Sequence, residues 1–204
     1  MKAKDYFSSK RIAFLALFTA LVTVATYIIK IPSPSGQGYI NVGDTIVFVC
    51  AFMFDPFFAL IAGGVGSALA DLVSGFVPYI LPTLIIKGLE GFVAAILFKV
   101  FRKCKFNTVV NFLISAFVGA LIMVFGYFTA EGFMFGWGVA AAGLVFNAIQ
   151  GGVGLVLGVA LASAFKKIRA INSLLTIERL AVNASDTITT HSEENEDKNE
   201  NSGN

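Results

Sequence analysis

The chain has 204 residues, of which 56% are hydrophobic and 14% are charged. A soluble domain needs much more polar surface, so this composition excludes an ordinary soluble protein and predicts an integral membrane protein. The net charge of +2 hides a segregation: acidic residues gather near the C-terminus, and basic residues flank the apolar segments. The only histidine, His191, lies in the polar C-terminal part. The membrane part is therefore expected to contain neither a histidine metal site nor histidine-assisted catalysis.

Six apolar segments follow one another along the chain. A helix that crosses a bilayer needs about 20 mostly apolar residues, and only the second segment is clearly shorter. A signal peptide is the alternative for the first segment, but its apolar core would be shorter and a small-residue cleavage site would follow. The sequence predicts an all-α fold, an integral membrane bundle of six helices, with spans expected at residues 11–29, 40–54, 56–76, 82–101, 108–130 and 138–165.

The basic residues predict the orientation of these spans. They concentrate in one set of connecting segments, and the opposite set carries only Lys30. Since cytoplasmic loops carry the excess of Lys and Arg, both termini are expected in the cytoplasm. The outer loops are then "KIPSPSGQGY", "VPYIL" and "EGFMFGW". Residues 1–170 are expected to form the membrane domain, and the polar, acidic residues 171–204 a disordered cytoplasmic tail.

Two opposite charges lie inside the fourth apolar segment. Lys87 and Glu90 are three residues apart, so they share a helix face with Thr83. Other expected helices also carry their polar residues toward the outer end, namely Asn41, Asp44, Asp71, Glu131, Asn147 and Gln150. Because a charge in a membrane is costly unless it pairs or reaches water, we expect one outward-facing polar pocket.

Structural roles for the same residues remain open alternatives. Lys87 and Glu90 alone are equally compatible with a buried ion pair that fixes helix packing. Residues near helix ends, such as Asn41, Asp44 and Glu131, also suit helix caps or interhelical hydrogen bonds. The first segment has no intramembrane charge after Arg11 at its start, but Ala13, Ala16 and Ala20 place small residues along it. Such spacing lets another helix approach closely, either within the bundle or from a partner.

Patterns that would indicate catalysis are missing from the sequence. No group of Cys, His, Asp or Glu has metal-ligand spacing, and the G-x-x-x-x-G-K-[ST] phosphate-binding pattern is absent. We therefore expect no metal, no cofactor, no ATP site and no nucleic-acid partner. Binding of a small molecule is favoured over an enzymatic activity.

Four stretches carry a resemblance to a known family: "GYINVGDTIVF", "GGVGSALADL", "PTLIIKGLEGFVAAIL" and "NAIQGGVGLVLG". In this order they resemble the substrate-binding S component of energy-coupling factor (ECF) vitamin transporters, in the subfamily around riboflavin and hydroxymethylpyrimidine uptake. The resemblance covers residues 11–165, and the K-G-x-E-G string from Lys87 to Gly91 is its most specific part.

The resemblance implies a function as well as a fold. An S component binds a vitamin or its precursor on the outer side of a bacterial plasma membrane. It works with a membrane coupling protein, called the T component, and two cytoplasmic ATPases, and it is thought to topple in the membrane. The coupling protein would contact the face of Ala13, Ala16 and Ala20. The loop at residues 31–39 would act as a lid.

The ligand expected from the resemblance is a small heteroaromatic compound, such as hydroxymethylpyrimidine, pyridoxine or a riboflavin-like molecule. Tyr79 and Trp137 would stack on its ring, and the polar residues named above would supply hydrogen bonds. One alternative is a self-sufficient secondary transporter in which Lys87, Glu90 and Asp71 relay protons. Another is a membrane-embedded enzyme or assembly factor.

Overall fold

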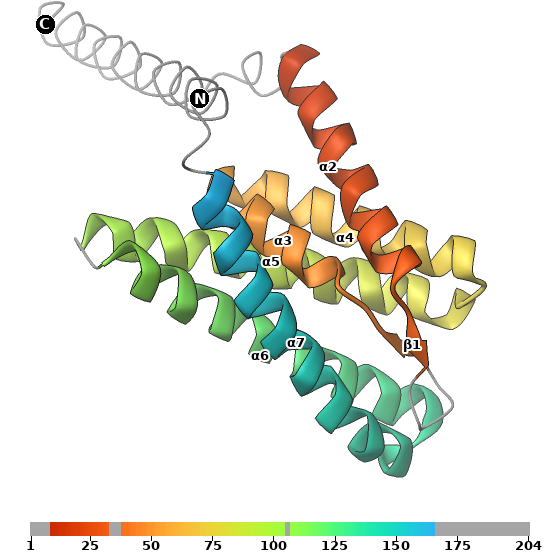
Figure 1. Ribbon diagram of the computed structural model, residues 1–204. Helices are drawn as coiled ribbons and strands as arrows, with labels where there is room; N and C mark the ends of the chain where they lie inside the picture. The colour runs from red at the N-terminus through yellow and green to blue at the C-terminus, as the bar shows by residue number, and fades with distance from the viewer. Residues whose placement is uncertain (1–8, 33–37, 105–106, 166–204) are drawn as a thin grey trace, which may run out of the picture. The chain divides into compact units, whose positions relative to one another are not determined.

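The computed structural model describes residues 9–32, 38–104 and 107–165 (Figure 1). Contacts divide the chain into two units. One unit is Phe14–Ala164, and the other combines Met1–Ala13 with Phe165–Asn204. Of the second unit, only the ends of two helices are described, at residues 9–13 and 165. The expected tail, residues 171–204, lies outside the described residues, and the description below concerns the first unit.

The described residues form six α-helices and one short 3-10 helix, which confirms the all-α prediction. Five of the helical segments are long and apolar enough to cross a membrane, and α3, with 11 residues, is shorter. The helices are α2 (Ser9–Ile28), α3 (Gly43–Met53), α4 (Pro56–Ser74), η1 (Val77–Tyr79), α5 (Ile80–Lys103), α6 (Thr108–Phe135) and α7 (Trp137–Phe165).

Local sequence signals explain where several helices begin and end. Asp55 caps α4, because its side chain accepts hydrogen bonds from the backbone amides of Phe57 and Phe58 at 3.0 and 3.2 Å. Pro56 occupies the first turn, where its missing amide proton costs nothing. The same helix ends at Gly75, whose φ of +78° is easily reached only without a side chain.

Three expected boundaries are wrong. The stretch "VPYIL" is not a loop, since η1 and the first turn of α5 occupy it and Pro82 stands inside that turn. The stretch "EGFMFGW" is not a loop either, because α6 continues through Glu131 to Phe135. Only Gly136, with φ of +98°, breaks the chain before α7. Asn41 precedes α3 rather than lying in it, and its side chain accepts a hydrogen bond from the amide of Gly43 at 2.9 Å.

A short antiparallel ribbon connects α2 to α3. Its strands are β1 (Ile31–Pro32) and β2 (Tyr39–Ile40), and Ile31 pairs with Ile40. Residues 33–37 between the strands lie outside the described residues. The ribbon is the described part of the loop that we expect to act as a lid.

Helix α5 is the centre of the unit and packs against α3, α4 and α6. Figure 1 shows α4 and α5 running side by side. Glycine makes this contact close: a Cβ atom added at Gly64 would stand 2.6 Å from the carbonyl oxygen of Leu84. A Cβ atom at Gly91 would stand 2.9 Å from the carbonyl oxygen of Ala59. Both distances are too short for a side chain, so these glycines set the separation of the two helices.

Aromatic side chains fill the end of the unit where α3 and α5 terminate and α6 begins. The ring centroids of Phe52, Phe98 and Phe112 lie 4.5 to 5.2 Å apart. Asn111 is buried beside them and donates a hydrogen bond to the Phe98 carbonyl oxygen at 2.9 Å. This end is therefore packed as a hydrophobic core, and polar side chains collect toward the other end of the helices.

Candidate binding site

A polar cavity lies at the end of the unit where α4 finishes, α5 begins and α6 turns into α7. Its walls also include the last turn of α2 and the β1–β2 ribbon. The cavity volume is about 40 Å³, which is room for a few water molecules. Segments far apart in the sequence thus converge on one small space, as the prediction of a single polar pocket requires.

A network of charged side chains forms the floor of this cavity. The Lys87 ammonium group donates to a carboxylate oxygen of Asp44, and to Oε2 of Glu90 at 3.0 Å. Lys87 is 2% exposed, and both carboxylates are fully buried. Gln150 extends the network, since its Nε2 donates to the other Asp44 oxygen at 3.0 Å and its Oε1 accepts from the Asn41 backbone amide at 3.0 Å.

This network has the form expected for a structural ion pair of Lys87 and Glu90. The side chains come from α3, α5 and α7, so the contacts tie three helices together. A buried ion is stable only when opposite charges and hydrogen bonds surround it, and Lys87 has two carboxylates as partners. The cluster contains two carboxylates and one ammonium group, and Oε1 of Glu90 is buried without a hydrogen-bond partner among the described residues.

Three tyrosines build the walls. Tyr39 of β2 donates to Oδ1 of Asp71 at 2.7 Å, and Tyr79 of η1 donates to Oε1 of Glu131 at 3.3 Å. The hydroxyl groups of Tyr127 and Thr83 lie 3.0 Å apart and share a hydrogen bond. Each wall carboxylate thus has one oxygen held by a phenol.

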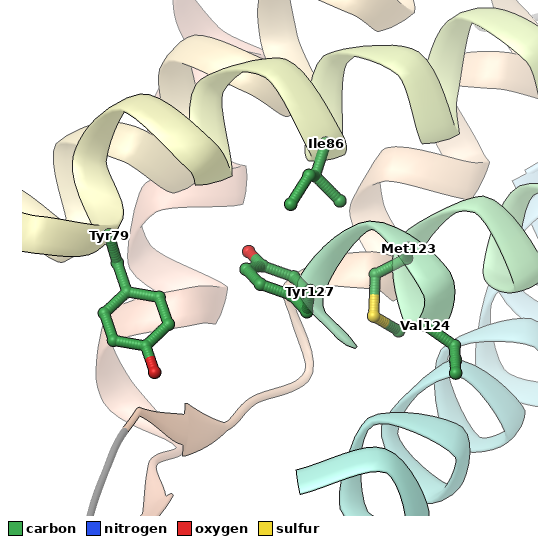
Figure 2. Close-up of a cluster of buried hydrophobic side chains, with 5 residues drawn as sticks. All are labelled: Tyr79, Ile86, Met123, Val124 and Tyr127. Atoms are coloured by element: carbon green, nitrogen blue, oxygen red, sulfur yellow. The ribbon is translucent and has the colours of Figure 1, made fainter. Parts of the chain in front are cut away.

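A hydrophobic cluster supports two of these tyrosines from behind. Figure 2 shows Tyr79 projecting from the segment before α5, and Tyr127 on α6 with Met123 and Val124. Ile86 of α5 points toward the same space. All five side chains are buried. Because this packing fixes both rings, their hydroxyl groups are held at defined positions in the wall.

Several buried polar atoms in the wall have no hydrogen-bond partner in the described part of the chain. In native proteins nearly all buried polar atoms are paired, and an unpaired one costs about 1–3 kcal/mol. Water or a ligand in the cavity is the natural partner for these atoms. They are Thr26 Oγ1, Asp71 Oδ2, Glu131 Oε2 and Asn147 Nδ2.

The ribbon contributes Tyr39 and Ile40 to the lining of the cavity. The ring of Tyr39 packs against Phe76 with centroids 4.9 Å apart. Burial, and then the neighbouring Asp71, raise the pKa of the Tyr39 phenol, so it remains a neutral donor. Lys30 holds the start of the ribbon: its ammonium group donates to Ser74 Oγ at 2.6 Å and lies 4.0 Å from the centroid of the Tyr27 ring.

Comparison with known proteins identifies the family. The profile of the family described as "ECF-type riboflavin transporter, S component" matches residues 6–167. The chain belongs to this family of S components. It is therefore a transporter subunit of the membrane and not an enzyme, and the predicted resemblance is confirmed.

Two proteins are similar in sequence to this S component. The chain is 35% identical to the thiamine precursor transporter HmpT of Lactococcus lactis subsp. cremoris over 173 residues, which is 84% of this chain and 97% of the relative. It is 37% identical to an uncharacterized protein of Pyrococcus woesei over 146 residues, 72% of this chain and 95% of the relative. As an S component, the chain is the substrate-specific subunit of an ECF-type importer for a vitamin or vitamin precursor.

The S component brings most of its predicted site residues together. Asp44 and Glu90 do not line the cavity, but both accept a hydrogen bond from Lys87, which does. Trp137 lies elsewhere: it is 54% exposed, and its ring packs against Phe128 and Phe133. The predicted residues that line the cavity are Asn41, Asp71, Tyr79, Lys87, Glu131, Asn147 and Gln150. Their contact with a substrate remains a prediction.

Sequence reasoning missed several lining residues of this S component. Thr26 is one of them, although Thr19, Thr23 and Thr26 form an i, i+4, i+7 stripe on an otherwise apolar helix. That stripe was a usable signal, since such spacing marks one helix face. Tyr39 was missed because the sequence predicted a loop there and not a strand. Gly143 was missed because a residue without a side chain gives no signal of a binding site.

Proposed function

We propose that this S component captures a small pyrimidine of the thiamine-precursor type in the polar cavity, from the outer side of a bacterial plasma membrane. The observation that carries the proposal is the cavity itself, where buried polar atoms without partners face one another at a single end of the unit. The relative named as a thiamine precursor transporter, with 97% of its length covered, supports the choice of ligand. Pyridoxine-like and riboflavin-like compounds are the competing ligands.

The size of the cavity favours a small ligand. Its volume of about 40 Å³ is far below the ~300–1,000 Å³ of a typical ligand pocket. A single six-membered ring therefore requires less displacement of the walls than the three fused rings of riboflavin. We expect the β1–β2 ribbon to move, because its Tyr39 is held by non-covalent contacts with Asp71, Phe76 and Lys30.

We further propose that α2 is the surface through which this chain meets its T component and, through it, two cytoplasmic ATPases. Residues Ala13, Ala16 and Ala20 are all exposed. Only 11% of the α2 span is buried, compared with 28–56% for the other long spans. A helix face of small residues permits close approach of a second helix, which supports the assignment.

Isothermal titration calorimetry of the purified chain in detergent tests the ligand. The titrants are 4-amino-5-hydroxymethyl-2-methylpyrimidine, pyridoxine, riboflavin and pantothenate. We expect saturable one-to-one binding of the pyrimidine in the nanomolar to low micromolar range, with weaker or no binding of the others. Saturable binding of riboflavin or pyridoxine alone would show that the proposed ligand is wrong, but it would agree with a vitamin-binding transporter subunit. Absence of binding by every member of an extended vitamin panel would refute the proposal.

A further inference from the structure

Two residues that line the cavity each carry an unpartnered polar atom, and these atoms have opposite hydrogen-bonding character. Glu131 Oε2 is an acceptor and Asn147 Nδ2 is a donor, and both are buried without a partner among the described residues. A Cβ atom added at Gly143 would stand 2.6 Å from the first and 3.8 Å from the second. The missing side chain of Gly143 therefore allows the Glu131 carboxylate to lie close to α7, near Asn147.

An acceptor and a donor that line the same cavity are the two groups needed to recognise one edge of a nitrogen heterocycle. Proteins recognise an exocyclic amino group beside a ring nitrogen with an acceptor placed next to a donor, as asparagine and glutamine do on adenine. Here the acceptor is a carboxylate oxygen, so its bond to an amino group is charge-assisted and stronger than a neutral one. The other oxygen of Glu131 accepts from Tyr79 at 3.3 Å, which holds the carboxylate in place.

We propose that Glu131 and Asn147 determine specificity by binding the amino group and the adjacent ring nitrogen of an amino-substituted nitrogen heterocycle. This inference rests on the function proposed above and narrows its ligand to a chemical class. Glu131 Oε2 accepts from the amino group, and Asn147 Nδ2 donates to the ring nitrogen. A ring with a carbonyl group in place of the amino group presents an acceptor to the carboxylate and is rejected.

A second unpartnered acceptor extends the pattern. Asp71 Oδ2 lines the same cavity, while Oδ1 of Asp71 is held by Tyr39. It suits a further donor on the ligand, such as a hydroxyl group. The carboxylates that line the cavity belong to Asp71 and Glu131, and the ammonium group of Lys87 is already paired with Asp44 and Glu90 beneath it. An anionic ligand would meet this excess of negative charge, so neutral or cationic rings are selected.

The unaltered protein provides the first test. Its affinity for 4-amino-5-hydroxymethyl-2-methylpyrimidine is compared by calorimetry with that for the 4-oxo analogue, which differs only at the recognised edge. Because hydrogen bonds to a charged group contribute about 1.5–3 kcal/mol, we expect the amino compound to bind about 10- to 150-fold more tightly. Equal affinity for the two compounds overturns the inference.

Two variants and a matched control test whether the preference for the amino compound depends on Glu131 and Gly143. Glu131→Gln can present a donor where the carboxylate oxygen stood, so the preference for the amino compound over the oxo analogue should fall at least tenfold. Gly143→Ala places a Cβ 2.6 Å from Glu131 Oε2, so the carboxylate has to move, and binding of the amino compound should weaken about tenfold or more. Gly152→Ala is the control on the same helix, because an added Cβ there meets no atom within 4 Å.

The outcomes separate this inference from the proposed function. If Glu131→Gln still binds the amino compound, and the ratio of its affinities for the amino and oxo compounds is unchanged, the inference is overturned and the proposed function stands. Equal affinities of Gly143→Ala and Gly152→Ala also overturn it. Preferential binding of an anionic vitamin contradicts the inference while the chain remains a vitamin-binding subunit. If no compound of the vitamin panel binds, both the inference and the proposed function are refuted.

Discussion

Removal of Lys87 should be among the most damaging single changes in this protein. Lys87→Met leaves the buried carboxylates of Asp44 and Glu90 facing each other without their cation. Breaking a buried ion pair in this way costs about 3–5 kcal/mol. For a chain of this length, 1 kcal/mol corresponds to about 2–4 °C in melting temperature, so we expect a loss of about 6–20 °C.

The two carboxylates should not be equivalent. Asp44 accepts from both Lys87 and Gln150, whereas Glu90 accepts only from Lys87 and has one oxygen without a partner among the described residues. Asp44→Asn is therefore expected to destabilise the protein more than Glu90→Gln. The triple variant with Lys87→Met, Asp44→Asn and Glu90→Gln should be more stable than Lys87→Met alone, since it no longer buries unpaired charge.

Thermal unfolding of the purified proteins in one detergent measures these differences. Lys30→Met is a suitable control, because Lys30 has no carboxylate hydrogen bond among the described residues. Loss of its hydrogen bond to Ser74 and its contact with the Tyr27 ring should cost about 1–2.5 kcal/mol. A melting temperature of Lys87→Met within about 2 °C of the unaltered protein, less than the shift expected for 1 kcal/mol, would refute the reasoning. So would a triple variant that is less stable than Lys87→Met.

Three further predictions concern the lid, the coupling surface and the orientation. Tyr39→Phe removes the hydrogen bond to Asp71, so the ligand should dissociate several-fold faster in a stopped-flow experiment, and an unchanged rate would exclude Tyr39 as the lid contact. Ala16→Trp and Ala20→Trp should leave ligand binding intact but prevent co-purification with the T component, and normal assembly of both would reject α2 as the coupling surface. Cys104 is an exposed thiol and should react with impermeant maleimide only from the cytoplasmic side, so labelling in intact cells would reverse the proposed orientation.

The number of helices and the general position of the polar site were predictable from the sequence. Apolar length alone located the long spans, and Asp55 followed by Pro56 marked the start of α4 correctly. The uneven placement of polar residues along the helices predicted one polar end. These signals are local, so each can be recognised before any contact between helices is known.

Contacts between distant segments were not predictable in the same way. The sequence placed Lys87 beside Glu90, but the contact of Lys87 with Asp44 joins residues 43 positions apart and depends on how α3 meets α5. The end of α6 was misjudged because Gly132 and Gly136 are both plausible stops, and only Gly136 adopts a positive φ. Trp137 belongs to the expected outer region, yet its position on α7 turns it toward Phe128 and Phe133.

ATP-dependent uptake in reconstituted vesicles tests the central claim most directly. The chain is incorporated with a T component and two ATPases, and the uptake of radiolabelled 4-amino-5-hydroxymethyl-2-methylpyrimidine is followed with and without internal ATP. The account predicts uptake only when all components and ATP are present. Accumulation by the chain alone, driven by a proton gradient, would contradict it and establish a self-sufficient secondary transporter.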